Sequence, residues 1–233
     1  MAPLLSGSRR ANAVSLTLIL SGVLAAQFHL GSKSAPAPTT PVSASGQFDY
    51  FILSLSWAPE FCAQPEAAGA NPRECASGRN IAFVVHGLWP EVREGKSPES
   101  CAPAKTVSKG LVNDLLPYMP SPGLIQHEWA THGTCTGLTQ DQYFTKVLLA
   151  RSAVQIPVQI TSISGTETES PSQIEAQFAG SNPEFPPGAF RTVCRNGAFT
   201  EIRACFDKGL KARACTESAG ECTSPMLTIR PPR

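Results

Sequence analysis

The eight cysteines of this 233-residue chain all lie at or after position 62. An even set of cysteines in an exported chain is typical of a small domain held by disulfides, since disulfides persist in oxidising compartments. Cysteine spacing alone leaves their pairing open. The pattern predicts a secreted or periplasmic protein whose fold is stapled by disulfide bonds.

The N-terminal segment supports export. Arg9 and Arg10 precede a mainly apolar run over residues 13–26. A basic region followed by a short apolar one is typical of a secretory signal, and the run is short for a membrane-spanning helix, which needs about 20 apolar residues. We expect a signal peptide at 1–26, a flexible Ser/Pro/Ala-rich linker at 27–46 and one folded domain at 47–233. An uncleaved anchor remains the alternative; after signal removal we expect no stable membrane association.

Composition limits the class of protein. The hydrophobic content of 42% and the charged content of 16% favour a folded domain over a disordered chain. Three of the 19 Lys and Arg residues precede position 46, which leaves 16 basic against 18 acidic residues, a net charge of −2. This balance excludes a strongly basic nucleic-acid coat or a polybasic membrane binder.

The apolar pattern predicts a mixed fold. Alternating or continuous apolar residues predict strands at 49–57, 81–85, 198–206 and 226–229. Helical spacing, proline stops and N-cap residues predict helices at 106–116, 141–154 and 170–178. Strands and helices do not alternate regularly, and Pro and Gly are frequent, so we expect a loop-rich α+β fold.

The first candidate site residue is His86. It directly follows the apolar run 81–85 and precedes Gly87. We expect the strand to end at Val85 and to hold His86 at the edge of a cleft. The alternative is a histidine that merely completes the core.

The second candidate site is the segment 127–135 (HEWATHGTC). In a helix, Glu128 and His132 are four residues apart and share a face, with His127 beside it and Gly133 as a stop. A carboxylate and two imidazoles on one turn suit acid–base chemistry, since imidazole titrates near neutral pH. We expect Glu128 to favour the charged form of His132.

Competing chemistries fit this segment less well. A zinc protease places two histidines four residues apart, whereas His127 and His132 are five apart. Cys135 is unsuited as a zinc ligand or nucleophile, because an exported cysteine in an even set is normally oxidised. Two histidines and a glutamate instead suit phosphoryl transfer with an internal nucleophile. The RNA 2′-hydroxyl is such a nucleophile and DNA lacks it, so we expect an RNA substrate, no DNA cleavage and no metal or cofactor.

Residues 86–90 (HGLWP) and 127–135 closely resemble, in this order, the two active-site segments of the ribonuclease T2 family, and 55–62 and 200–207 are also similar to that family. The resemblance spans about residues 48–229. It implies an α+β fold with helices packed on a central antiparallel sheet, and a secreted, metal-independent endoribonuclease. Separately, we expect the protein to be a monomer. Such an enzyme cleaves single-stranded RNA to 2′,3′-cyclic phosphates and then to 3′-phosphates. The alternative is a catalytically weakened RNA-binding or toxin-like relative.

The resemblance also implies roles for individual residues. His132 would be the general base, His86 the general acid and Glu128 a stabiliser of the transition state, while His127 would contact phosphate. Thr131 stands where the family often has lysine. The missing fixed charge can cost about 10²–10³ in rate, although the Thr131 hydroxyl can still donate to the phosphate.

Two further residues and the disulfides follow from the same resemblance. Trp89 would stack on a base, and Glu91, where fungal members have aspartate, would hydrogen-bond that base. The implied disulfide pairs are Cys62–Cys75, Cys101–Cys135, Cys194–Cys222 and Cys205–Cys215.

Overall fold

The structure is a computed structural model, and it describes residues 45–216 and 222–232. The expected signal peptide and all but the end of the expected linker lie outside these residues. Within them, no helix combines the length and apolar character needed to cross a bilayer.

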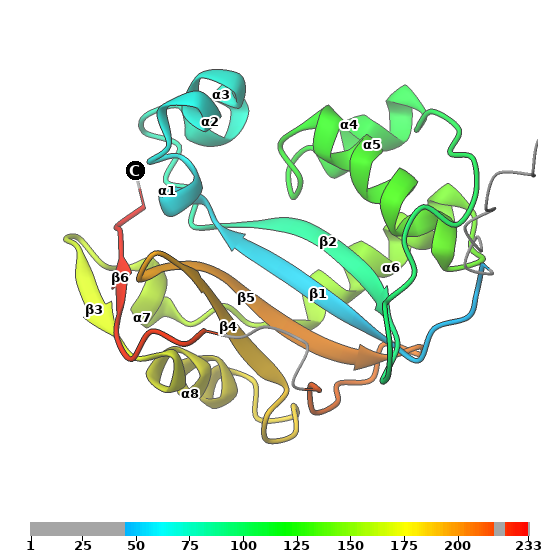
Figure 1. Ribbon diagram of the computed structural model, residues 1–233. Helices are drawn as coiled ribbons and strands as arrows, with labels where there is room; N and C mark the ends of the chain where they lie inside the picture. The colour runs from blue at the N-terminus through cyan, green and yellow to red at the C-terminus, as the bar shows by residue number, and fades with distance from the viewer. Residues whose placement is uncertain (1–44, 217–221, 233) are drawn as a thin grey trace, which may run out of the picture. The chain divides into compact units, whose positions relative to one another are not determined.

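A six-stranded sheet forms the centre of the described domain (Figure 1). Its order is β2-β1-β5-β6-β3, and β4 pairs with β5. The strands are β1 Tyr50–Trp57, β2 Phe83–Glu91, β3 Glu167–Glu169, β4 Phe190–Arg195, β5 Ala198–Asp207 and β6 Leu227–Ile229. The pairing is antiparallel apart from one parallel contact between β5 and β6. The predicted α+β fold with a central antiparallel sheet is therefore confirmed.

Four longer helices pack around the sheet, and their starts are capped by side chains. They are α4 Lys109–Leu115, α5 Pro122–Thr131, α6 Gln140–Ala153 and α8 Pro171–Ser181. Ser108 caps α4, which therefore begins three residues later than position 106, where we expected it. Ser170 forms a capping box with Gln173 and is followed by Pro171, as the sequence indicated for α8.

Short helices occupy two connections. The segment that Cys62 and Cys75 bracket contains two short helices, and a third precedes it. These helices are α1 Ala58–Phe61, α2 Pro65–Ala70 and α3 Pro72–Cys75, and α7 Val158–Thr161 follows α6. Each of α1 to α3 has proline in its first turn, which pre-sets the helical backbone angle.

The two faces of the sheet differ in character. On β1, every second residue from Phe51 to Trp57 is buried in the main core with aromatic residues of α6 and α8. The residues between them face the other way, where Tyr50 and Ile52 form a smaller cluster with Cys205. Farther along β1 this second face becomes polar, with Ser54 and Ser56. The period-two alternation of β1 thus leaves one face of the sheet for polar side chains.

Four disulfides staple the domain. They join Cys62 to Cys75, Cys101 to Cys135, Cys194 to Cys222 and Cys205 to Cys215, the pairs that the resemblance implied. The second of these fixes the loop after β2 to the turn that follows α5. Each such bond typically stabilises a fold by roughly 2–4 kcal/mol.

Candidate active site

His86 lies in a β-bulge. In the pairing of β1 with β2, Ser54 lies opposite Gly87 and Leu55 opposite Val85, so His86 has no partner residue. A bulge inserts one extra residue and re-aims side chains without ending the strand. The expectation that the strand stops at Val85 is therefore wrong, because pairing resumes and β2 runs to Glu91.

Gly87 allows helix α5 to approach this strand closely. A Cβ atom at position 87 would overlap the carboxyl group of Glu128 and the indole nitrogen of Trp89. Only glycine leaves this space, and the Glu128 side chain fills it. The glycine after His86 thus brings the two sequence motifs together.

Glu128 is a buried carboxyl at the centre of the site. One oxygen, Oε2, accepts a hydrogen bond of 2.8 Å from Trp89 Nε1, and the other, Oε1, lies 3.8 Å from His86 Nε2. Oε1 has no hydrogen-bond partner among the described residues. Burial raises the pKa of Glu128 to about 7, although the charge of His86 and the bond from Trp89 oppose the shift.

A second glutamate, Glu201 on β5, holds His86 from the other side. Its Oε1 lies 2.8 Å from His86 Nδ1, and its Oε2 accepts bonds from Ser54 Oγ at 3.0 Å and from Arg203 Nη2 at 3.1 Å. Burial would raise its pKa, but the hydrogen bond and charge of His86, with Arg203 and Ser54, lower it to about 2. Glu201 is therefore an ionised, fixed partner of His86.

Sequence reasoning assigned no role to Glu201. The segment 200–207 resembles the ribonuclease T2 family, but only the neighbouring positions of β1, β2 and β5 bring Glu201 to His86. The available signal was alternation, since Glu201 and Arg203 face opposite to the core residues Ile202 and Ala204. Alternation gives the face of a residue and not its neighbour on another strand.

The two candidate catalytic histidines differ in proton affinity. Burial by itself lowers the pKa of His86, but the hydrogen bond and charge of Glu201 and the charge of Glu128 outweigh it, so the pKa is raised. For His132, burial and the charges of His127 and His86 lower the pKa to about 4. At neutral pH, His132 is accordingly neutral, while His86 retains its proton more readily than a free imidazole.

The expected effect of Glu128 on His132 is wrong. Glu128 was expected to favour the charged form of His132, but its carboxyl turns to Trp89 and His86. His132 forms the C-cap of α5, where the helix ends, so helical spacing no longer sets the direction of its ring. Its electrostatic neighbours are the other two imidazoles.

Trp89 connects these groups. Its ring centre lies 5.1 Å from that of His86 and 5.4 Å from that of His132, and the Arg203 guanidinium lies over the indole at 4.8 Å. The indole also donates its hydrogen bond to Glu128. Trp89 is thus packed within the site and helps to hold the catalytic groups.

The remaining predicted site residues lie around this centre. Thr131 Oγ1 is 3.5 Å from His127 Nδ1 on the last turn of α5. Glu91 ends β2, and its carboxyl is hydrogen-bonded by Ser97 Oγ. Burial raises the pKa of Glu91. Of the predicted site residues, His86, Glu128, Trp89 and His132 are the ones that the structure brings into direct contact or close approach.

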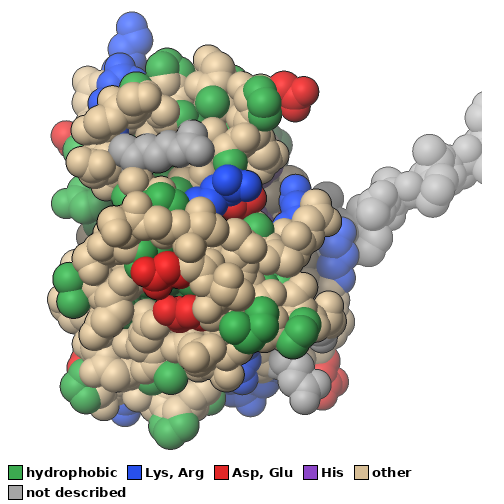
Figure 2. All heavy atoms as spheres, turned by 90° about the vertical axis from the view of Figure 1, so that its left-hand side faces the viewer, with side chains coloured by type: hydrophobic (Ala, Val, Ile, Leu, Met, Phe, Trp, Pro, Cys, Tyr) green, Lys and Arg blue, Asp and Glu red, His purple; other side chains and the backbone are tan. Residues whose placement is uncertain are grey.

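A cleft of about 360 Å³ opens beside His86. Its walls come from β1, β2, β4, β5, the start of α5 and the short helices α1 and α3, and His132 is not among its lining residues. None of the histidines is visible on the face shown in Figure 2, where β3 and β6 lie. The histidine cluster and this cleft share His86.

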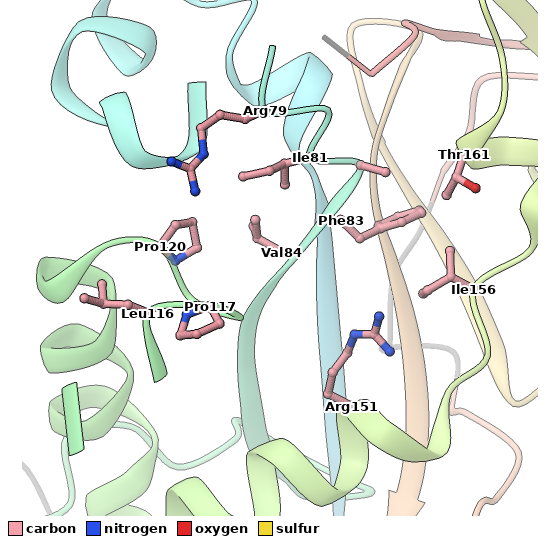
Figure 3. A pocket seen from close by; sticks show the side chains of 11 residues that line it. Arg79, Ile81, Phe83, Val84, Leu116, Pro117, Pro120, Arg151, Ile156 and Thr161 are labelled. Atoms are coloured by element: carbon pink, nitrogen blue, oxygen red, sulfur yellow. The ribbon is translucent and has the colours of Figure 1, made fainter. Parts of the chain in front are cut away.

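A second cavity, of about 390 Å³, shares the lining residue Val84 with this cleft. Figure 3 shows Arg79 and Arg151 at two ends of this space, with Ile81 and Phe83 between them. Its lining contains no histidine and no carboxylate. Of the two histidine motifs, only His86 reaches either space, and it lines the first cleft.

Comparisons with known proteins point to one family. The model of the ribonuclease T2 family matches residues 48–215. A ribonuclease of Aeromonas hydrophila is 38% identical over 117 residues, which cover 49% of this chain and 51% of that relative. A probable ribonuclease of Haemophilus influenzae is 29% identical over 184 residues, covering 74% of this chain and 63% of that relative. The chain thus spans between about half and two thirds of these curated relatives.

A solved structure has the same fold. The RNase-related protein from Calystegia sepium superposes with a TM-score of 0.62 at 25% identity, covering 78% of this chain and 97% of that chain. The family match spans well over half of this chain and includes both histidine motifs. The chain belongs to the ribonuclease T2 family.

Proposed function

We propose that this protein is a secreted, metal-independent endoribonuclease that cleaves single-stranded RNA by transesterification. The observation that carries the proposal is the placement of two imidazoles around Trp89, whose ring centre lies 5.1 Å from that of His86 and 5.4 Å from that of His132, with the pKa of His86 raised and that of His132 lowered. Acid–base catalysis of this kind needs one neutral and one protonated imidazole at the same pH. His132 meets the first requirement and His86 the second.

In the proposed reaction one histidine accepts a proton from the RNA and the other donates a proton to it. His132 removes the proton of the RNA 2′-hydroxyl, whose oxygen forms a bond to the adjacent phosphorus. The bond from phosphorus to the 5′-oxygen breaks, and His86 gives its proton to that oxygen. The products are a 2′,3′-cyclic phosphate and a free 5′-hydroxyl, and water then opens the cyclic phosphate to a 3′-phosphate with the two roles reversed.

The other residues stabilise charge on the phosphorus. Protonated Glu128 can donate to a phosphoryl oxygen, and its pKa of about 7 keeps that proton available at acidic and neutral pH. His127 and Thr131 supply further donors at the end of α5. Glu201 keeps His86 charged and fixes which ring nitrogen faces the substrate.

The nucleoside on the 2′-hydroxyl side would lie near Trp89 and Glu91. Trp89 then has two tasks, contact with the base and orientation of Glu128. We further propose that residues 1–26 are removed on export, that residues 27–46 form a linker and that the mature enzyme acts as a monomer without a cofactor.

Cleavage of single-stranded RNA in excess chelator tests this proposal. We expect cleavage with cyclic phosphate ends, and a loss of activity in His86→Ala and His132→Ala variants that keep the wild-type circular dichroism spectrum. RNA binding without cleavage would favour the weakened relative. Loss of cleavage on chelation would instead require a metal-dependent enzyme.

A further inference from the structure

The second cavity contains two positive charges that nothing in its walls balances. Arg79 and Arg151 lie at its two ends (Figure 3), and its lining includes no carboxylate. Within the described residues, neither guanidinium forms an ion pair. Arg151 Nη1 donates a hydrogen bond of 3.0 Å to the Val154 carbonyl, and this is the only hydrogen bond of that side chain in the same part of the chain. The cavity therefore presents free guanidinium donors to a ligand.

The two arginines differ in exposure, and both fit an anionic ligand. Arg151 is half-buried, and burial lowers the pKa of its guanidinium although the nearby Tyr118 raises it. A partly desolvated cation without a carboxylate is costly, so an anion at this place would relieve the cost. Arg79 is exposed and can turn toward a ligand. Guanidinium groups bind phosphate through two parallel hydrogen bonds, so phosphate is the anion that suits both ends.

The walls between the two arginines are apolar. Ile81, Phe83 and Ile156 are half-buried, and Pro117 is exposed. The volume of about 390 Å³ lies within the range of small-ligand sites, about 300–1,000 Å³. An apolar surface with a cation at each end suits a flat ring that has a phosphate on either side. One nucleotide of an RNA strand, with its two flanking phosphates, has this composition.

The cavity adjoins the cleft at His86. Val84 lines both spaces, and Pro120 lines the cavity while the next residue, Ser121, lines the cleft. Val84 precedes His86 by two residues of β2, a distance of about 6–7 Å. In Figure 3, Val84 and Pro120 lie on the Arg79 side of the cavity. In the proposed mechanism His86 protonates the leaving 5′-oxygen, so the RNA on the 3′ side of the broken bond begins at His86 and has this cavity within reach.

We propose that this cavity is a second RNA-binding site, which holds the nucleotide after the leaving nucleoside, with its base against the apolar walls and one flanking phosphate on each arginine. This inference rests on the proposed ribonuclease function. Arg79, nearer to the cleft, would bind the phosphate that follows the leaving nucleoside, and Arg151 the next one. Each contact should lower KM by about 3- to 10-fold, the effect of one net hydrogen bond. The value of kcat should change little, because these phosphates do not react.

Substrates with a single cleavable bond test this site. In a uridine followed by deoxyadenosines, only the uridine has a 2′-hydroxyl, so only the bond after it can be cleaved. UpdA has no phosphate beyond the leaving nucleoside, UpdApdA has one and UpdApdApdA has two. A fourth substrate has an abasic residue in place of the second deoxyadenosine of UpdApdApdA. We would measure kcat and KM for all four at one pH and at low salt.

Arg79→Gln and Arg151→Gln are the informative variants, and Arg73→Gln is their matched control. In the wild type, KM should fall by about 3- to 10-fold with each added phosphate, and the abasic substrate should lose part of the second gain. Arg79→Gln should lose the first gain and Arg151→Gln the second, while both cleave UpdA as the wild type does. Arg73 is exposed on α3 and lines neither space, so Arg73→Gln should keep both gains.

The outcomes separate this site from the proposed function. An equal KM for all substrates in the wild type, or gains that both variants keep, overturns the site and leaves the ribonuclease assignment intact. Gains that Arg73→Gln also loses overturn it too, because they reflect a general attraction to positive charge. No cleavage of any of these substrates overturns the proposed function and the inference with it. Arg151 bonds the end of α6, but the wild-type series and the exposed Arg79 decide the matter even if Arg151→Gln does not fold.

Discussion

Replacing Glu201 by glutamine removes one negative charge beside His86 and keeps the size of the side chain. In the wild type, His86 Nδ1 lies 2.8 Å from the Glu201 carboxylate, which has a pKa of about 2 and is therefore ionised at all working pH values. The variant keeps a neutral acceptor at the same place. The proton on His86 is then held less tightly, so the pKa of His86 falls.

The magnitude follows from the type of hydrogen bond. A bond to a charged group is worth about 1.5–3 kcal/mol, against about 0.5–1.5 kcal/mol for a neutral pair. A loss of about 1–1.5 kcal/mol lowers the protonated fraction of His86 about 5- to 13-fold at a pH above both pKa values. We therefore expect kcat/KM of Glu201→Gln to fall by about this factor on the alkaline side and to approach wild type at lower pH.

The assay is kcat/KM for one dinucleotide between about pH 3.5 and 9. The wild-type profile should be bell-shaped, with an acid limb set by His132, whose pKa is about 4, and an alkaline limb to which loss of the His86 proton and of the Glu128 proton both contribute. In Glu201→Gln the alkaline limb should move to lower pH while the acid limb stays near its place. Ser54→Ala, which removes one 3.0 Å bond to Glu201, should move the same limb less. An unmoved alkaline limb, with the fold intact, would refute the assignment of His86 as the acid.

Three further predictions concern the helix end, the buried carboxyl and a disulfide. Thr131→Lys places a cation at the C-terminal end of α5, beside His127; we expect single-turnover cleavage to become faster and the acid limb to move down, and an equal or slower rate with an unmoved profile would show that no cation is missing. Glu74 has a pKa raised from 4.5 to about 7, so its stabilising proton is present below pH 4.5 and is lost as the pH rises through 7. Urea unfolding should therefore show Glu74→Gln gaining about 1–3 kcal/mol relative to wild type between pH 5 and pH 8, and a constant difference would contradict the buried-acid account. Removing the bond between Cys101 and Cys135 as a double serine variant should cost roughly 2–4 kcal/mol of stability and lower kcat, measured by thermal unfolding and cleavage; full activity at normal stability would separate this disulfide from the site.

Much of the secondary structure could be predicted from the sequence because it depends on local residue patterns. The alternation over 49–57 predicted β1 and its two faces, and Ser170 with Pro171 predicted the start of α8. Such signals depend on residues within one or two turns of each other. The short helices between Cys62 and Cys75 escaped prediction because single turns lack a periodic pattern.

The sequence by itself determined which residue types carry the chemistry. His86, Glu128 and His132 stand in two motifs whose residue types and order were sufficient to indicate acid–base chemistry on RNA. The close approach of Glu128 to Gly87, by contrast, became visible only in the structure.

Only the tertiary structure decided the protonation of these groups and the identity of their partners. The bulge at His86 turns that side chain to Glu201, a residue 115 positions later, and burial leaves Glu128 and Glu74 with raised pKa values. A pKa depends on desolvation and on charges within a few ångströms, and strands that are distant in the chain supply both. For this reason the contact of Glu201 with His86 and the burial of Glu74 became visible only once β1, β2, β5 and α3 were in place.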